Sequence, residues 1–207
     1  MPHLSALRRR RARRPLSRRL SAVALASAAL LAAPTVSVSA AEAAPRAQAA
    51  NVLDVTMQAQ QKSNWCWAAS GNTIATWMGR NYSQNQFCNA AFNRQQGFDC
   101  PNNQATLGNV QNALRWAGIR PGSYVDGWLQ YGTVQNEINA RRPIETRIQW
   151  SSGGGHMHVI YGYDNSNGFV YWGDPWPSNN RYNWATHNWY INNNQHRWTH
   201  SLYQIGA

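Results

Sequence analysis

Apolar side chains between residues 65 and 140 recur at helical spacing. From Trp65 to Met78 the apolar residues are near helical spacing, at Trp67, Ala68, Ile74, Ala75 and Met78, and Gly79 ends this segment. Ser63 or Asn64 just before it is suited to cap a helix. Three further segments with helical spacing, bounded by polar or glycine residues, are predicted at 83–92, 106–116 and 131–140. The first half of the folded chain is therefore predicted to be helical.

The hydrophobic pattern changes after residue 143. Short runs of β-branched and aromatic residues are now separated by Gly, Asn, Asp and Pro, which is typical of strands and turns. The predicted strands are 144–150, 157–163, 169–172, 184–191 and 198–205. Because helices come first and strands second, the predicted fold class is α+β with an antiparallel sheet.

Residues 1–40 have the three parts of a secretory signal peptide. An Arg-rich stretch precedes an apolar run over about residues 20–33, and small residues follow around Ala40 and Ala41, where we expect cleavage. The run is shorter than the roughly 20 residues that cross a bilayer, so we expect a secreted protein with no stable membrane anchor. The pair Arg18-Arg19 leaves a twin-arginine export route open. Retention of the apolar run as a membrane anchor is the alternative to cleavage.

The rest of the chain is predicted to contain one domain. Residues 41–50 are rich in alanine and have no core pattern, so we expect a flexible leader there. Residues 51–207 contain no internal repeat and no linker, which favours a single compact domain and a monomer.

The formal net charge of +11 is concentrated at the N-terminus. Eight of the 19 basic residues lie before residue 20, and outside residues 1–40 the chain has 11 basic against 8 acidic side chains. Nucleic-acid binding therefore has little support in the predicted domain. That domain contains all 11 Trp and all three Cys, and 43% of the whole chain is apolar, which is enough for a packed core.

The three cysteines predict one disulfide and one free thiol. In an exported protein two cysteines are expected to pair, and Cys88 with Cys100 would close a short loop rich in Asn and Gln. The remaining Cys66 lies at the first turn of the first predicted helix, where free backbone N–H groups and the helix dipole favour a thiolate. Cys66 is therefore a candidate nucleophile.

The second half of the chain has the other groups that thiolate chemistry on a carbonyl requires. His156 and His158 follow three glycines at the start of a predicted strand, and either ring could carry a proton. Asp174 follows a later strand and could accept the N–H of the imidazole. Upstream of the cysteine, the Gln60 side-chain amide could donate a hydrogen bond to an oxyanion.

These residues resemble the papain-like cysteine peptidases. The motifs are Gln60 six residues before Cys66-Trp67, His156 ahead of V-I-Y-G-Y, and Asp174-Pro-Trp176. The form W-C-W-A-A-S is most similar to the short bacterial branch of that family, which includes secreted and effector peptidases. The resemblance covers about residues 51–207. It implies a helical half bearing the cysteine, a sheet half bearing the histidine and a cleft between them.

The resemblance also implies a role for each site residue. Cys66 would be the nucleophile and His156 the general base and acid, while Asp174 would orient the imidazole. Gln60 and the Cys66 N–H would form the oxyanion hole. The substrate would be a polypeptide, cleaved through a thioester acyl-enzyme without a cofactor or a metal. Plant and animal members have Asn where this chain has Asp174. Because the predicted leader is short, we do not expect inhibition by a folded propeptide.

Several alternatives stay open at this point. His158 lies on the same strand face as His156 and could replace it, and Gln61 could replace Gln60. The H-x-H pair with Asp174 could instead bind zinc. A transglutaminase-like acyl transferase would use the same three roles, and a catalytically silent relative would use none. The aromatic side chains of Trp184, Trp189, Tyr190 and Trp198 could form a binding platform, although strand spacing favours a core on one face and sheet cover on the other.

Overall fold

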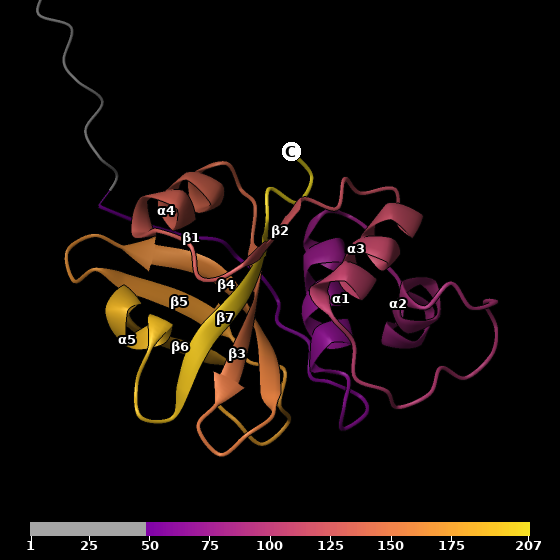
Figure 1. Cartoon of the computed structure of the whole chain (residues 1–207). Coiled ribbons are helices and arrows are strands. Elements are labelled where there is room, and N and C mark those ends of the chain that lie inside the picture. Colours follow the sequence, from indigo (N-terminus) through magenta and orange to yellow (C-terminus); the bar gives the residue numbers. More distant parts are fainter. Residues whose placement is uncertain (1–48) are drawn as a thin grey trace, which may run out of the picture. The chain divides into compact units, whose positions relative to one another are not determined.

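The computed structural model describes residues 49–207, and three helices of the first half pack against each other in it (Figure 1). These are α1 (Cys66–Trp77), α2 (Gln84–Ala91) and α3 (Leu107–Trp116). Ser83 and Thr106 form capping boxes at the starts of α2 and α3, which explains why both helices begin where the sequence predicts. The helix predicted at 131–140 forms as α4 (Tyr131–Asn139), and α5 (His187–Ile191) is a short helix late in the chain.

The strands form one seven-stranded antiparallel sheet within residues 49–207. Its order is β2-β7-β3-β4-β5-β6, and β1 pairs with β4 outside this path. The strands are β1 (Ala50–Val52), β2 (Ser123–Asp126), β3 (Ile144–Trp150), β4 (Gly155–Asp164), β5 (Phe169–Gly173), β6 (Tyr182–Thr186) and β7 (His196–Tyr203). The predicted α+β class with an antiparallel sheet is confirmed.

The structure corrects some of the predicted elements. The strand predicted at 184–191 is wrong in its second half, because Thr186 accepts a hydrogen bond from the Trp189 N–H and caps α5. The short strands β1 and β2 were not predicted. Ala50, the last residue of the predicted leader, begins β1 and pairs with Asp164. The rest of the leader up to residue 48 and the signal peptide predicted at 1–40 lie outside the described residues.

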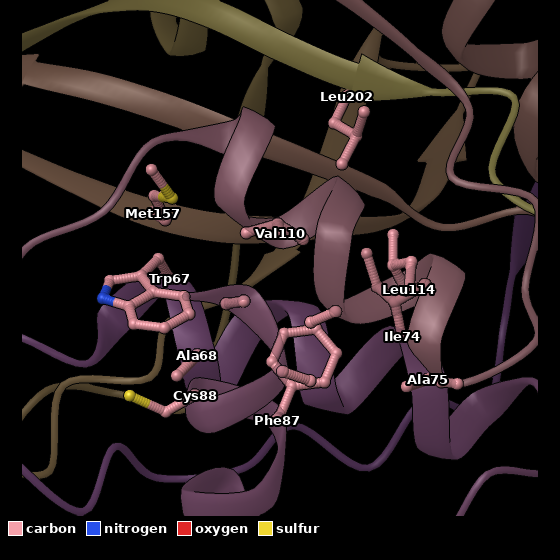
Figure 2. Packing of buried hydrophobic residues seen from close by; sticks show 14 of the residues in the cluster. Trp67, Ala68, Ile74, Ala75, Phe87, Cys88, Val110, Leu114, Met157 and Leu202 are labelled. Carbon is pink, nitrogen blue, oxygen red and sulfur yellow. The ribbon is translucent and has the colours of Figure 1, made fainter. Parts of the chain in front are cut away.

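Two hydrophobic clusters cover the two faces of the sheet. One lies between the sheet and α1–α3, where Met157 and Leu202 from the sheet pack near Trp67, Phe87 and other helix residues (Figure 2). The other contains residues of α4 and α5 on the opposite face. The free cysteine on α1 and the histidines of β4 are therefore held by elements with packed interiors.

Gly71 is required where α1 packs against α2 and α3. A Cβ at this position would lie 2.7 Å from Phe87 Cε1 and 2.9 Å from Val110 Cγ1. Gly71→Ala is therefore expected to lower the free energy of unfolding by about 1–3 kcal/mol, as measured by urea unfolding. Gly132→Ala in α4 is the matched control, because the nearest atom to its new Cβ is 3.9 Å away and alanine favours helix. An equal loss in both variants would contradict this interpretation.

Candidate active site

Two buried tryptophans hold the turn that carries Cys66. The indole N–H of Trp65 donates to the Pro101 carbonyl at 3.1 Å, and that of Trp67 donates to the Asn103 carbonyl at 3.0 Å. Each Trp is only 1% exposed. Because they flank the cysteine in sequence, their anchors fix the start of α1 against the segment 101–103.

The predicted disulfide stabilises the same segment. Cys88 on α2 is bonded to Cys100, directly before Pro101. The Lys62 ammonium adds a second link, since it contacts the Asp99 carboxylate at 2.7 Å and donates to the Cys100 carbonyl at 2.6 Å. Cys66 is free, as predicted, and it is half-buried.

The first turn of α1 has no side-chain cap. Trp65 is the N-cap residue and gives no side-chain hydrogen bond to the helix, so the predicted caps Ser63 and Asn64 are wrong. Both instead hydrogen-bond with Asn102 across the loop. The N–H groups at the start of α1, with the positive end of the helix dipole, thus remain without a side-chain oxygen where Cys66 lies.

His156 on β4 hydrogen-bonds with Asp174, which follows β5. His156 Nε2 lies 2.7 Å from Asp174 Oδ1, and both side chains are buried. The Trp176 backbone N–H and the Asn179 side-chain amide also donate to this carboxylate, each at 2.8 Å. The carboxylate is therefore held by its own turn, and Nδ1 is the ring nitrogen of His156 left for Cys66.

The electrostatics of this group favour a protonated imidazole. Burial alone lowers the pKa of His156, but hydrogen bonds with Asp174 and Cys66, together with the charges of both, raise the pKa to about 9. Burial alone raises the pKa of Asp174, but His156 and His158 together hold that pKa well below its ordinary value. Thus at neutral pH His156 is positively charged and Asp174 is ionised.

His158 belongs to a separate hydrogen-bonded network with Tyr190 and Thr146. The pairing of Ile148 with His156 and of Thr146 with His158 places both rings on one face of β4, as expected. His158 Nδ1 lies 3.2 Å from Tyr190 Oη, which is 2.6 Å from Thr146 Oγ1. Burial lowers the pKa of His158 to about 4, since Asp174 offsets only part of the cost of charging a buried ring. This ring is neutral at neutral pH.

A cavity of about 340 Å³ at Cys66 is lined by residues of both the helical half and the sheet half. Cys66 and His156 both line it, and His158 does not. Trp150 stacks on the His156 ring at 6.0 Å between centroids, and Trp176 meets the ring edge-on at 6.3 Å. The ring that faces the thiol is thus held between two aromatic side chains.

Gln60 is tied to the turn after Asp174, and its side-chain amide binds backbone carbonyls. Its backbone N–H donates to the Pro175 carbonyl at 2.8 Å, which ties it to the turn after Asp174. Its side-chain Nε2 donates to the carbonyls of Lys62 and Ser63, and its Oε1 is buried without a partner among the described residues. Gln61, the alternative, has an exposed side chain.

The sequence interpretation did not identify three residues that support the site. They are Trp150, which stacks on His156, Asn179, which donates to Asp174, and Tyr190, which contacts His158. Their spacing from the motifs has no regular pattern. Only the closeness of Asn179 to the D-P-W turn could have suggested a role for one of them.

This fold and site define a papain-like cysteine peptidase, with the cysteine at a helix N-terminus in one half and a histidine on the sheet of the other. The chain belongs to the family described as papain-like cysteine protease AvrRpt2, whose model matches residues 49–195. The predicted resemblance is therefore confirmed. No curated protein sequence matches the chain closely.

The two histidines are expected to differ in their effect on turnover. His156→Ala should lower kcat for peptide hydrolysis by roughly 100-fold or more, because it removes the ring that faces Cys66. His158→Gln should retain more activity, because its ring does not line the cavity. Steady-state kinetics on both variants checks this. An active His156→Ala beside an inactive His158→Gln would reverse the assignment.

Proposed function

We propose that this protein is a secreted peptidase that hydrolyses peptide bonds through Cys66, His156 and Asp174. One observation carries the proposal: Cys66 and His156 line the same cavity, while the opposite side of the His156 ring is bound to Asp174 at 2.7 Å. The family match supports cysteine peptidase chemistry in general. The roles of individual residues are our inference from the geometry.

In the proposed reaction the Cys66 thiolate attacks the substrate carbonyl carbon while His156 is protonated. A carbon–sulfur bond forms, and the carbonyl oxygen becomes an oxyanion. Collapse of this intermediate breaks the carbon–nitrogen bond, and the leaving amine takes the proton from His156 Nδ1. Neutral His156 then accepts a proton from water, whose oxygen attacks the thioester carbon; the carbon–sulfur bond breaks, and the carboxylic acid is released with the Cys66 thiolate and protonated His156 regenerated.

The start of α1 is the proposed oxyanion site. Its backbone N–H groups, including that of Cys66, have no side-chain cap, and the helix dipole favours negative charge there. Gln60 is the second proposed donor. For this role its Nε2 has to release one of the two carbonyls that it binds, Lys62 or Ser63, when substrate enters.

Export is proposed together with this activity. The Arg-rich and apolar pattern of residues 1–40 predicts a signal peptide, and the Cys88–Cys100 disulfide suits an oxidising compartment. Within residues 49–207, no helix combines the length and apolar character needed to cross a membrane.

Cleavage of a diverse peptide mixture tests the function. The protein without residues 1–40 is incubated with the mixture, and the new peptide ends are sequenced by mass spectrometry. We expect new ends that are absent after alkylation with iodoacetamide and that are not lost in the presence of a chelator. Loss of cleavage with the chelator alone would refute the thiol mechanism. The absence of cleavage with every peptide would favour a catalytically silent relative.

A further inference from the structure

His156, His158 and Asp174 form a compact group of metal-binding side chains. One nitrogen from each ring and one carboxylate oxygen all lie within 4.8 Å of one another. The three residues are only 6%, 2% and 5% exposed. Two imidazole nitrogens and a carboxylate oxygen are ligands that suit Zn²⁺.

His158 has a ring nitrogen that the active site leaves unused. Its Nε2 is buried and has no hydrogen-bond partner among the described residues. This atom lies 3.6 Å from Asp174 Oδ2, which is longer than a hydrogen bond. The opposite nitrogen contacts Tyr190 Oη, and the Tyr190 hydroxyl is itself bound to Thr146. A ring held by a hydrogen bond at one nitrogen, with the other nitrogen left free, is the usual setting of a metal-binding histidine.

A second cavity, which Cys66 does not line, reaches this group. Its volume is about 440 Å³, and its lining includes His158 and Asp174 but not Cys66. The other lining residues include no Lys or Arg, and several are amides or hydroxyls that can hold water, namely Ser178, Asn179, Asn180, Asn183 and Gln195. A hydrated cation thus has a route to His158 and Asp174 that avoids the substrate cavity.

We propose that His156, His158 and Asp174 form an inhibitory Zn²⁺ site. Two ring nitrogens, one carboxylate oxygen and a water from the second cavity would complete four ligands. Binding replaces the hydrogen bond between His156 Nε2 and Asp174, and the Nε2 proton passes to solvent. Without that hydrogen bond, Asp174 no longer orients the His156 ring for its proposed proton transfers. Cys66 is not a ligand, because it is absent from the group of three.

The inhibitory effect rests on the proposed peptidase function, whereas the metal site does not. Binding is therefore measured directly, on full-length folded Cys66→Ala protein titrated with Co²⁺ and followed by its visible absorption. We expect one equivalent of Co²⁺ to bind and to be displaced by Zn²⁺. His158→Gln and His156→Gln in the same background should each weaken binding by at least about tenfold. Circular dichroism confirms that each variant is folded.

The matched control is His200→Gln on β7. His200 is partly exposed beside Asp126, lies two strands away from β4 and is not a member of the group of three, so this change should leave Co²⁺ binding unaltered. Undetectable binding to Cys66→Ala would overturn the proposal, as would equal binding to folded His158→Gln. In the active protein, Zn²⁺ should inhibit hydrolysis and a chelator should restore it. If Co²⁺ binds but no peptide is cleaved, the peptidase function fails and the metal site stands.

Discussion

Cys66→Ala is expected to lower peptide hydrolysis by roughly 10⁴-fold or more, because no other group in the cavity can form the thioester. The side chain is half-buried at the surface of the cavity, and the turn around it is held by Trp65 and Trp67. The melting temperature should therefore change little. Both quantities are measured on the same preparation, by release of peptide ends and by thermal unfolding.

Cys66→Ser is the matched variant for this result. It keeps the shape of the side chain but replaces the thiol by a hydroxyl, a much poorer nucleophile, so it should be similarly inactive. Wild-type rates of hydrolysis in either variant would exclude Cys66 as the nucleophile. A large fall in melting temperature would mean that the loss of activity comes from unfolding instead.

Glu145→Met is expected to raise the free energy of unfolding by about 1–3 kcal/mol at neutral pH. Glu145 lies on β3, is 0% exposed, and has no hydrogen-bond partner for either carboxylate oxygen among the described residues. Its strand partners Val159 and Leu202 belong to the cluster that faces the helices. Methionine is similar in length and needs no partner, so it removes a desolvation cost without leaving a cavity.

The gain should depend on pH. Burial, and to a lesser extent the charge of Cys66, raises the pKa of Glu145 well above the ordinary value of 4.5. The unfolded chain therefore ionises at this position while the folded chain stays neutral, and stability falls as pH rises through that window. Urea unfolding should show a larger gain at pH 8 than at pH 4.

Glu137→Met is the control, and it is expected to change the free energy of unfolding in the opposite direction. Glu137 is also buried, but it binds Arg142 at 2.8 Å and accepts from the Gln204 backbone N–H at 2.9 Å. Its replacement leaves those partners unpaired and should destabilise the protein. Loss of stability in both variants would contradict the claim that the Glu145 carboxyl group is buried without a partner within residues 49–207.

The fold could be predicted wherever local signals were strong. Ser83 and Thr106 capped their helices as the residue types suggest, and the long apolar strands were found. The strands β1 and β2, with three and four residues, are too short for an alternating hydrophobic pattern to be recognised. The region around Thr186 was misinterpreted because aromatic residues favour strands, whereas the Thr186 cap and burial of Tyr190 select a short helix.

The candidate site could be predicted in its residue types but not in its contacts. Sequence motifs identified Cys66, His156 and Asp174, but strand alternation could not separate His156 from His158. The choice depends on which ring lines the cavity, and this follows from the packing of two distant halves. The burial of Glu145 was hidden for a similar reason, since alternating polar residues suggest a solvent-facing surface and helices cover it here.

Alkylation of the single free thiol tests the central claim most directly. The chain has three cysteines and two are paired, so iodoacetamide has only Cys66 to modify in the folded protein. Aliquots alkylated to increasing extents are assayed for hydrolysis, and the modified fraction of Cys66 is measured by mass spectrometry. Residual activity should fall in proportion to that fraction and reach zero at one adduct per chain. Activity that persists when Cys66 is fully alkylated would contradict the proposed mechanism.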